Sequence, residues 1–145
     1  MVEHSSPVGI QGTYRFRTYD SITGELKRGS DWNHNLVVYS TNAGLGLIAQ
    51  QLIGITTYPL EITQLKIGTG ATAPVAGNTD LQTPVLAGVL RATQAFTATT
   101  ATMEFFIANA DLANGTYSEI GLFCGAQLFA RSLISPTYTK GSNED

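Results

Sequence analysis

The sequence is poor in charged residues. Only 13% of its 145 residues are Asp, Glu, Lys or Arg, about half of the quarter that is usual in globular proteins. Eight basic residues stand against eleven acidic ones, which gives a net charge of -3. Proteins that bind a phosphate backbone need clustered Lys and Arg, and the basic residues here are few and dispersed. We therefore expect no nucleic-acid partner.

Cysteine and histidine are also scarce. Cys124 is the only cysteine, which excludes a disulfide within the chain and a cysteine-rich metal site made by one copy. Its neighbours Leu122 and Phe123 are apolar, so we interpret Cys124 as a buried small hydrophobe. His4 and His34 lack the helical spacing of a zinc site, and His34 is predicted to lie in an exposed turn. We expect neither a metal nor a cofactor.

Motifs of the common enzyme classes are missing. Gly68-Thr-Gly70 is neither a dinucleotide fingerprint nor a phosphate-binding loop, and we interpret it as a turn after a strand. No nucleophile elbow is present, and no spacing of carboxylates indicates a glycosidase. No apolar run approaches the roughly 20 residues of a membrane span, and residues 1–9 lack the apolar core of a signal peptide. We expect a protein that is not an enzyme, is not inserted in a membrane and folds in a reducing cytosol.

The residues that are abundant indicate a β-rich fold. Thr is frequent, and Thr, Val, Ile, Tyr and Phe favour strands over helices. A chain of this length fits one domain, so we assign residues 1–145 to a single β-rich domain with short flexible termini. The predicted fold is mainly β and sandwich-like, with one short α-helix over about residues 42–53 and a long ordered loop over about residues 68–81.

Alternation and turn residues place the strands. A first hairpin is expected over 12–20 and 25–30, single strands over 60–67, 89–97 and 101–108, and a last hairpin over 117–124 and 127–134 that turns at Gly125. Asn114-Gly115 is the strongest turn signal in the chain. Pro136 is expected to end the last strand, because proline has no amide hydrogen to donate.

The helix and the core can be predicted in more detail. A polar residue at the helix start is expected to cap it, and Gly54 is expected to stop it. Leu81 is expected to anchor the long loop. Phe96, Met103, Phe105 and Phe106 are candidates for the core. The capping candidates are Ser40, Thr41 and Asn42.

Aromatic residues beside predicted loops are the candidates for binding. Their rings can stack on sugars or anchor a contact between proteins. The candidate ligand or interface contacts are Trp32, Tyr58, Tyr117 and Tyr138.

Two segments resemble parts of a known protein family. The stretch Leu65–Leu81, which contains Gly-Thr-Gly-Ala-Thr-Ala-Pro and Asn-Thr-Asp-Leu, is similar to a recurrent segment of bacteriophage tail-fibre and related virion structural proteins. The later Glu-Ile-Gly-Leu-Phe hairpin at 119–123 and Leu-Phe-Ala-Arg strand at 128–131 resemble parts of the same proteins. The likeness covers most of residues 35–140. It implies a virion structural protein, a tail-fibre, baseplate or collar subunit that is assembled in the host cytoplasm.

The resemblance also implies partners. Such a subunit contacts copies of itself, for which we expect a trimer, and other phage tail or capsid proteins. Two alternatives remain: a host-receptor or carbohydrate-binding module that uses Trp32, Tyr58 and the long loop, and a capsid decoration protein.

Two further expectations follow from the resembling segments. Glu119 and Arg131 are expected to pair across the last hairpin at the surface, where an ion pair contributes about 0 to 1 kcal/mol. Similar proteins continue past Ser135-Pro136 into a final strand, whereas this sequence ends at Asp145. Without such a strand, an exposed sheet edge would be open to strand addition by a partner.

Overall fold

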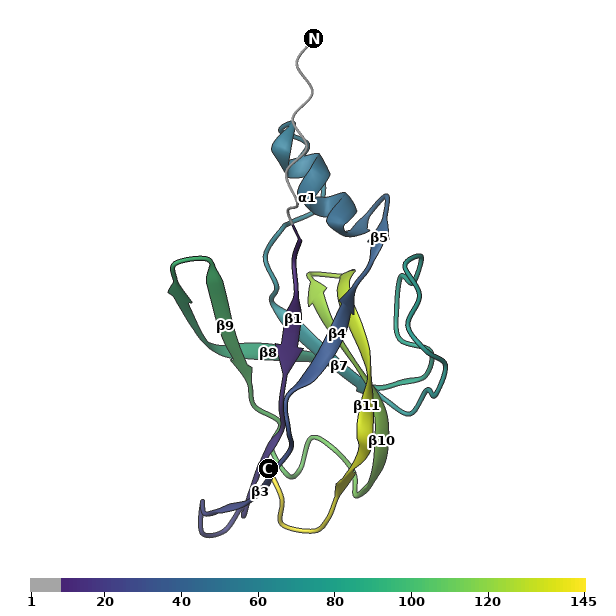
Figure 1. Ribbon diagram of the computed structural model, residues 1–145. Coiled ribbons are helices and arrows are strands. Elements are labelled where there is room, and N and C mark those ends of the chain that lie inside the picture. The colour runs from purple at the N-terminus through teal and green to yellow at the C-terminus, as the bar shows by residue number, and fades with distance from the viewer. Residues whose placement is uncertain (1–8) are drawn as a thin grey trace.

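The computed structural model describes residues 9–145 (Figure 1). Strands account for 51% of the residues and helix for 6%. The prediction of a mainly-β fold with one short helix is therefore confirmed. The flexible N-terminus that we expected falls on residues 1–8, outside the described range.

Most of the strands form one curled antiparallel sheet. Its seven strands follow the order β1-β4-β11-β10-β7-β8-β9, so β1 and β9 are its two edges. The sequence predicted a sandwich-like arrangement, and the structure has one large curled sheet. The strands are β1 (Gly12–Tyr14), β4 (Asn33–Val37), β7 (Gln64–Gly68), β8 (Pro84–Thr97), β9 (Thr100–Phe105), β10 (Gly115–Cys124) and β11 (Gln127–Lys140).

Smaller elements sit at the two ends of this sheet. β2 (Arg17–Tyr19) and β3 (Leu26–Gly29) form a hairpin at one end, and β5 (Tyr39–Ser40) pairs with β6 (Ala43–Gly44) at the other. The helix α1 (Leu45–Leu52) follows β6 directly. Figure 1 shows α1 and the β2–β3 hairpin at opposite ends of the molecule, with the β8–β9 hairpin projecting from the side.

The core lies on both faces of the central strands β7, β10 and β11. One group of buried side chains includes Ile67, Ile120 and Ile134, and residues such as Tyr14 and Phe105 pack against it. A second group brings Leu47 from α1 against Val37, Cys124, Phe129 and Ala130. A third group, on the face to which Phe123 points, is formed by Val38, Ala43, Phe123 and Leu128. The predicted burial of Cys124 is confirmed, since its side chain is 0% exposed.

Glycine positions the start of the helix. A Cβ on Gly44 would lie 1.8 Å from the carbonyl oxygen of Val38, and one on Gly46 would lie 1.9 Å from that of Ser40. Gly44 is the N-cap, and no side chain of residues 9–145 caps the helix, so the prediction of a cap at residues 40–42 was wrong. Close approach of the backbone, not capping chemistry, decides where α1 begins. Gly54, with φ 78°, follows the helix as predicted.

The first and last strands differ from the predicted ones. The strand expected over 12–20 is broken into β1 and β2, which belong to different sheets. Pro136 does not end β11, which continues to Lys140. The β10–β11 register shifts between the pairs Glu119↔Leu133 and Tyr117↔Tyr138, so Pro136 lies in an irregular stretch where no ladder amide is required of it. The residues that follow Ser135-Pro136 thus belong to β11 itself as far as Lys140.

Four predictions for single positions or turns are corrected by the structure. Phe96 and Phe106 are 76% and 58% exposed, not core residues. Phe96 belongs to the part of the β8–β9 hairpin that extends beyond the elements that could cover it, and Phe106 follows the last residue of β9. Met103 and Phe105 are partly buried. His34 is exposed as expected, but it belongs to strand β4 and not to a turn. The turn at Asn114-Gly115 leads directly into β10 and does not join two paired strands.

Candidate functional site

The two segments of the family resemblance meet at a buried ion pair. Glu119 on β10 is 0% exposed and Arg131 on β11 is 2% exposed. The Arg131 Nη2 and Nε atoms lie 2.8 and 3.1 Å from Oε2 of Glu119. The pairing predicted from the sequence is present, but the prediction that it lies at the surface was wrong. The sequence pattern gave no sign of burial, because the covering loop comes from a distant part of the chain.

Glu119 also holds the long loop between β7 and β8. Its carboxylate accepts hydrogen bonds from the backbone amides of Gly70 at 3.0 Å, Gln82 at 2.9 Å and Thr83 at 2.6 Å. A Cβ on Gly70 would lie 2.5 Å from Oε1 of Glu119, and one on Gly68 would lie 2.8 Å from it. The glycines of the Gly-Thr-Gly segment therefore leave room for a carboxylate to reach the backbone.

Arg131 reaches the middle of the same loop. Its Nη2 donates to the carbonyl oxygen of Thr72 at 2.9 Å, and its Nη1 donates to Oδ1 of Asn78 at 3.0 Å. Leu81, 6% exposed, is buried beneath the end of the loop as predicted. The guanidinium fork and the carboxylate together fix the loop at several points. We call this network of Glu119, Arg131 and the loop residues 69–83 the loop clamp.

The loop clamp is suited to holding structure. Burial by itself raises the pKa of Glu119, but the hydrogen bonds from Thr83, Gln82, Arg131 and Gly70 outweigh it and leave the pKa below its ordinary value. The carboxylate is thus kept ionised, with both oxygens occupied by donors. A general acid or base needs a group that can exchange a proton with a substrate, and Glu119 is enclosed instead.

A separate cleft lies inside the curl of the sheet. Its volume is about 690 Å³, and it runs between the β1–β2 segment and β9. Arg17 of β2 and Glu104 of β9 are joined across it by an ion pair of 2.6 Å. The aromatic residues that line it are Tyr14, Phe16, Tyr19, Trp32, Phe105, Phe106 and Tyr138.

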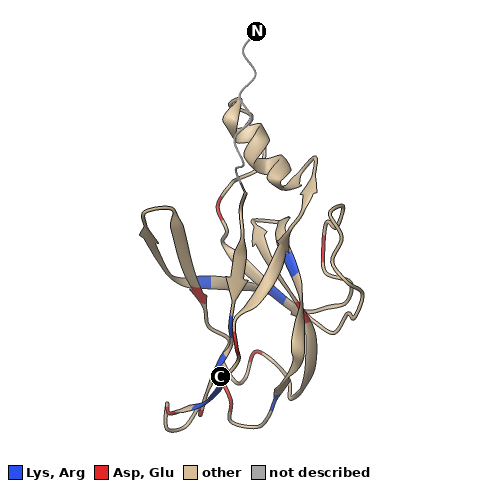
Figure 2. Cartoon of the chain, viewed as in Figure 1, with Lys and Arg blue, Asp and Glu red and all other residues tan. Residues whose placement is uncertain are grey.

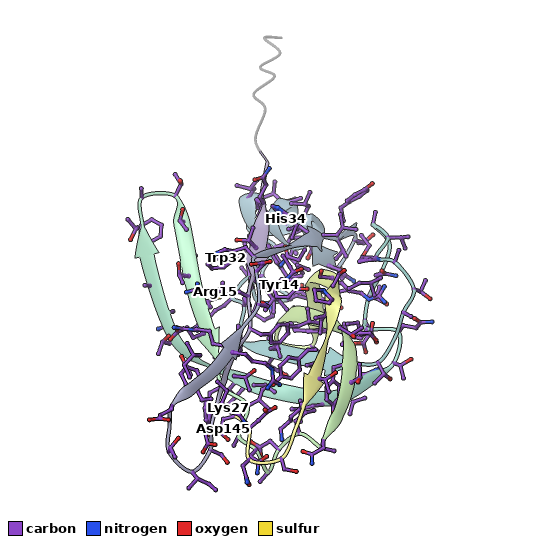
Figure 3. The ribbon with its side chains drawn as sticks, turned by 60° about the horizontal axis from the view of Figure 1, so that its bottom comes forward. Tyr14, Arg15, Lys27, Trp32, His34 and Asp145 are labelled. Atoms are coloured by element: carbon purple, nitrogen blue, oxygen red, sulfur yellow. The ribbon has the colours of Figure 1, made fainter. Side chains whose placement is uncertain are left out.

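Trp32 is the most accessible of the predicted contact residues. Its side chain is 60% exposed, and the guanidinium carbon of Arg15 lies 4.8 Å from the centre of its ring, in the range of a cation–π interaction. Figure 3 shows Trp32, Arg15 and Tyr14 close together where β1 and β4 run side by side. The cleft thus combines an accessible aromatic face with a cation.

The other three predicted contact residues are less accessible. Tyr117 is only 4% exposed and its hydroxyl donates to the carbonyl oxygen of Ala113 at 2.7 Å, so it belongs to the core. Tyr138 lines the cleft but stacks on Phe16 with 5.0 Å between ring centres. Tyr58 is partly buried against the group around Leu47. Of the four residues, only Trp32 and Tyr138 line the same cleft.

The C-terminal residues close one end of the cleft. Glu144 is 4% exposed and forms ion pairs with Arg28 at 2.5 Å and Lys27 at 3.1 Å. Figure 3 shows Lys27 and Asp145 near one another at this end. The backbone of Asp145 pairs with Tyr19 through two hydrogen bonds of 3.1 Å. The sequence pattern did not predict that the C-terminal residues pack against the rest of the protein. A short segment rich in polar and charged residues looks, in sequence, like a solvated tail.

The Glu144 contacts predict a pH effect on stability. Hydrogen bonds from Arg28 and from the Gly141 amide lower the pKa of Glu144 well below its usual range, which is about 4.3 in an unfolded chain. Its stabilising contribution is then complete above that value and is lost as the pH falls. Between about pH 5 and pH 2, unfolding free energy should fall less steeply for Glu144→Gln than for Glu25→Gln. Both variants lose one negative charge, and denaturant titrations that give equal slopes would contradict the prediction.

Other chemistry is sparse in the part of the chain that the structure describes. Burial raises the pKa of the Cys124 thiol to about 11, which leaves little of the reactive thiolate at neutral pH. Within residues 9–145, no group of three or more His, Cys, Asp or Glu side chains is placed to hold a metal ion. No helix in the same range has the length and apolarity needed to cross a bilayer.

The sequence and the fold were compared with those of known proteins. No protein-family model, curated protein or solved structure matches this chain.

Proposed function

We propose that this protein is a structural subunit of a bacteriophage particle, in a tail fibre, baseplate or collar, and that it works through contacts with copies of itself and with other virion proteins. One observation supports an assembly role above all. Large apolar side chains are exposed on parts of the molecule that carry no charge, among them Leu52 at 81% and Phe96 at 76%. Such surfaces commonly mark contacts between proteins.

The charges are distributed unevenly along the chain. No Asp, Glu, Lys or Arg occurs between Asn35 and Leu60, or between Ala92 and Met103. Figure 2 shows α1 and the outer part of the β8–β9 hairpin without charged residues, whereas charges gather around the β2–β3 hairpin and the C-terminus. A polar end and an uncharged end are expected of a subunit that is partly covered in an assembly.

The virion assignment rests on the resembling segments. These segments form the middle of the sheet, with β7, the long loop, β10 and β11 joined by the loop clamp. A fixed loop on a closely packed sheet is consistent with a scaffold, because its contacts consume the polar groups that catalysis would use. The resemblance and this architecture are two separate observations, and both support the proposed role as a virion structural subunit.

The location of the protein tests the proposal. Intact phage particles from the source are labelled with an antibody raised against the whole chain and viewed by immunogold electron microscopy. We expect label on the tail tip, fibres or collar. Label on the head would replace the proposal with a capsid decoration protein, and the absence of label from particles would refute a virion role.

A second candidate function is supported by the cleft. An exposed tryptophan with a neighbouring arginine, in a cavity lined by aromatic rings, suits stacking on a sugar of a host receptor. The tail location and this function are compatible, because a fibre subunit can also contact the host surface. The observation that favours it is the position of Trp32 beside Arg15 at the cleft.

Glycan binding can be measured directly. If the cleft recognises carbohydrate, the protein should bind a restricted set of sugars on a glycan array, and Trp32→Ala should weaken that binding at least about tenfold, since such anchors contribute about 2 kcal/mol or more. Tyr39→Ala is the matched control, because Tyr39 is 62% exposed at the other end of the molecule. Equal loss in both variants, or no binding at all, would argue against the second function.

A further inference from the structure

Within residues 9–145, the outer part of the β8–β9 hairpin pairs with no third strand. We call residues 92–103 the arm. Its two strands pair with each other, and β9 is the edge of the sheet. Residues 92–102 are exposed, with Phe96 near the tip at 76%. Figure 1 shows the arm standing away from the central strands.

A hairpin of this kind is not stable by itself. Two strands in water are marginal, and a third strand or a packed face is usually needed. Natural proteins also protect open edges with charged side chains, Lys above all, or with proline. The arm contains no proline and no charged residue. Both considerations indicate that the arm is covered by something in the working protein.

A second uncovered surface lies at the end of α1. Leu52, Ile53 and Ile55 are 81%, 76% and 43% exposed, and we call them the α1 patch. Gly54 lies between two of them with φ 78°, and this turn presents the three side chains at the end of the helix. The α1 patch belongs to the uncharged stretch between Asn35 and Leu60.

The exposed area of the chain fits a missing contact. The chain exposes 8914 Å² in total. Residues 1–8 are allowed for by subtracting the area that eight residues expose in a fully extended chain. The exposed area that is left is still about 800 Å² larger than the area expected for a compact monomer of the same mass. One partner contributes about 800 Å² to a protein–protein interface of standard size. The excess is thus large enough for neighbouring copies to cover part of each subunit.

We propose that the arm of one copy packs on the α1 patch of a second copy. The chain has a net charge of -3, so copies repel one another where their charged surfaces meet, and contact is favoured where neither copy carries charge. Each copy offers one arm and one patch. The interface is therefore heterologous, and it forms a ring of subunits when the rotation that relates neighbouring copies closes. This inference specifies how the homo-oligomer of the proposed function would assemble.

Two point variants test the contact by analytical ultracentrifugation of the full chain. Phe96→Ser removes the apolar tip of the arm and Leu52→Ser removes the most exposed residue of the patch. We expect the wild type to sediment as an oligomer and each variant to self-associate at least about tenfold more weakly. Ile22→Ser is the control, because Ile22 is 77% exposed in the β2–β3 turn, at the charged end. Circular dichroism checks that all variants remain folded.

A mixture of the two variants distinguishes an arm-to-patch contact from a contact between two arms or between two patches. Leu52→Ser retains an intact arm and Phe96→Ser retains an intact patch, so a mixture can form one productive interface per pair. We expect the mixture to contain a dimer with twice the 15.4 kDa mass of one chain, at a concentration at which the weakened self-association leaves each variant alone mainly monomeric. A contact in which arm meets arm, or patch meets patch, would not be restored by mixing.

The outcomes distinguish this inference from the proposed function. A monomeric wild type, an oligomer that persists in Phe96→Ser, or a mixture without the dimer would overturn the arm-to-patch contact. A virion location would remain possible in each of those cases. Conversely, restored dimers together with particles that carry no label would uphold the contact and refute the virion role.

Discussion

Replacing Arg131 by alanine is expected to lower the free energy of unfolding by about 3 to 5 kcal/mol, because it leaves a buried carboxylate without its cation. Glu119 is 0% exposed and its Oε2 lies 2.8 Å from Arg131 Nη2. The substitution also removes the hydrogen bonds from Arg131 to Thr72 and Asn78 in the loop. Equilibrium denaturation with urea measures the change.

Two further variants make this prediction specific. Arg17→Ala breaks the exposed pair with Glu104, whose side chains are 43% and 52% exposed, and should cost only about 0 to 1 kcal/mol. Arg131→Lys keeps the charge but loses the planar fork of donors, so its loss should fall between the two. If Arg131→Ala and Arg17→Ala were equally mild, the burial of the pair would carry no energetic consequence.

The same variant should release the long loop. Residues 69–83 are held through Glu119 and Arg131, and a loop that loses such contacts opens locally before the whole protein unfolds. Limited proteolysis under native conditions should therefore cut Arg131→Ala within this loop faster than it cuts the wild type. Cleavage elsewhere, with the loop still protected, would show that Glu119 alone fixes the segment through the backbone amides.

Replacing Phe123 by alanine is expected to cost about 3 to 5 kcal/mol, through lost burial and the cavity that remains. Phe123 is 0% exposed and packs with Val38, Ala43 and Leu128. The Lys66 ammonium also lies 4.2 Å from the centre of its ring. Thermal and urea unfolding at equal protein concentration give the loss.

The matched control is the same substitution at an exposed site. Phe106 is 58% exposed, so Phe106→Ala should change the free energy of unfolding by no more than about 0.5 kcal/mol. The sequence pattern favoured Phe106 as a core residue, and the structure assigns Phe123 to the core instead. A loss at Phe106 comparable to that at Phe123 would contradict this assignment.

The loop clamp and the uncharged surfaces play complementary parts in the proposed subunit. The loop clamp fixes the centre of the sheet with groups that face no solvent, so this region presents a constant shape. The arm and the α1 patch are attached to that centre through β8 and α1. A rigid centre keeps two interaction surfaces at a fixed geometry, and subunits in a ring require this for closure.

Local sequence was sufficient for several elements of the fold. The turn at Gly125, where φ is 57°, joins β10 and β11 as predicted, because the residue at that position must adopt a left-handed conformation. The spacing of apolar residues and the stop at Gly54 placed α1 correctly. The Gly, Pro, Asn and Asp residues of the segment 68–81 predicted the long loop. In each case, the signal lies within a few residues of the structure that it specifies.

The amino-acid sequence by itself thus determined the β-rich composition, the last hairpin, the helix and the loop, since backbone preferences and turn chemistry act locally. Tertiary structure alone decided which side chains are covered. It buried Glu119 and Arg131 beneath a loop more than thirty residues away in sequence, left Phe96 exposed on the arm, and brought Glu144 against Arg28. Burial depends on which distant segments pack together, and no pattern within a single segment records that.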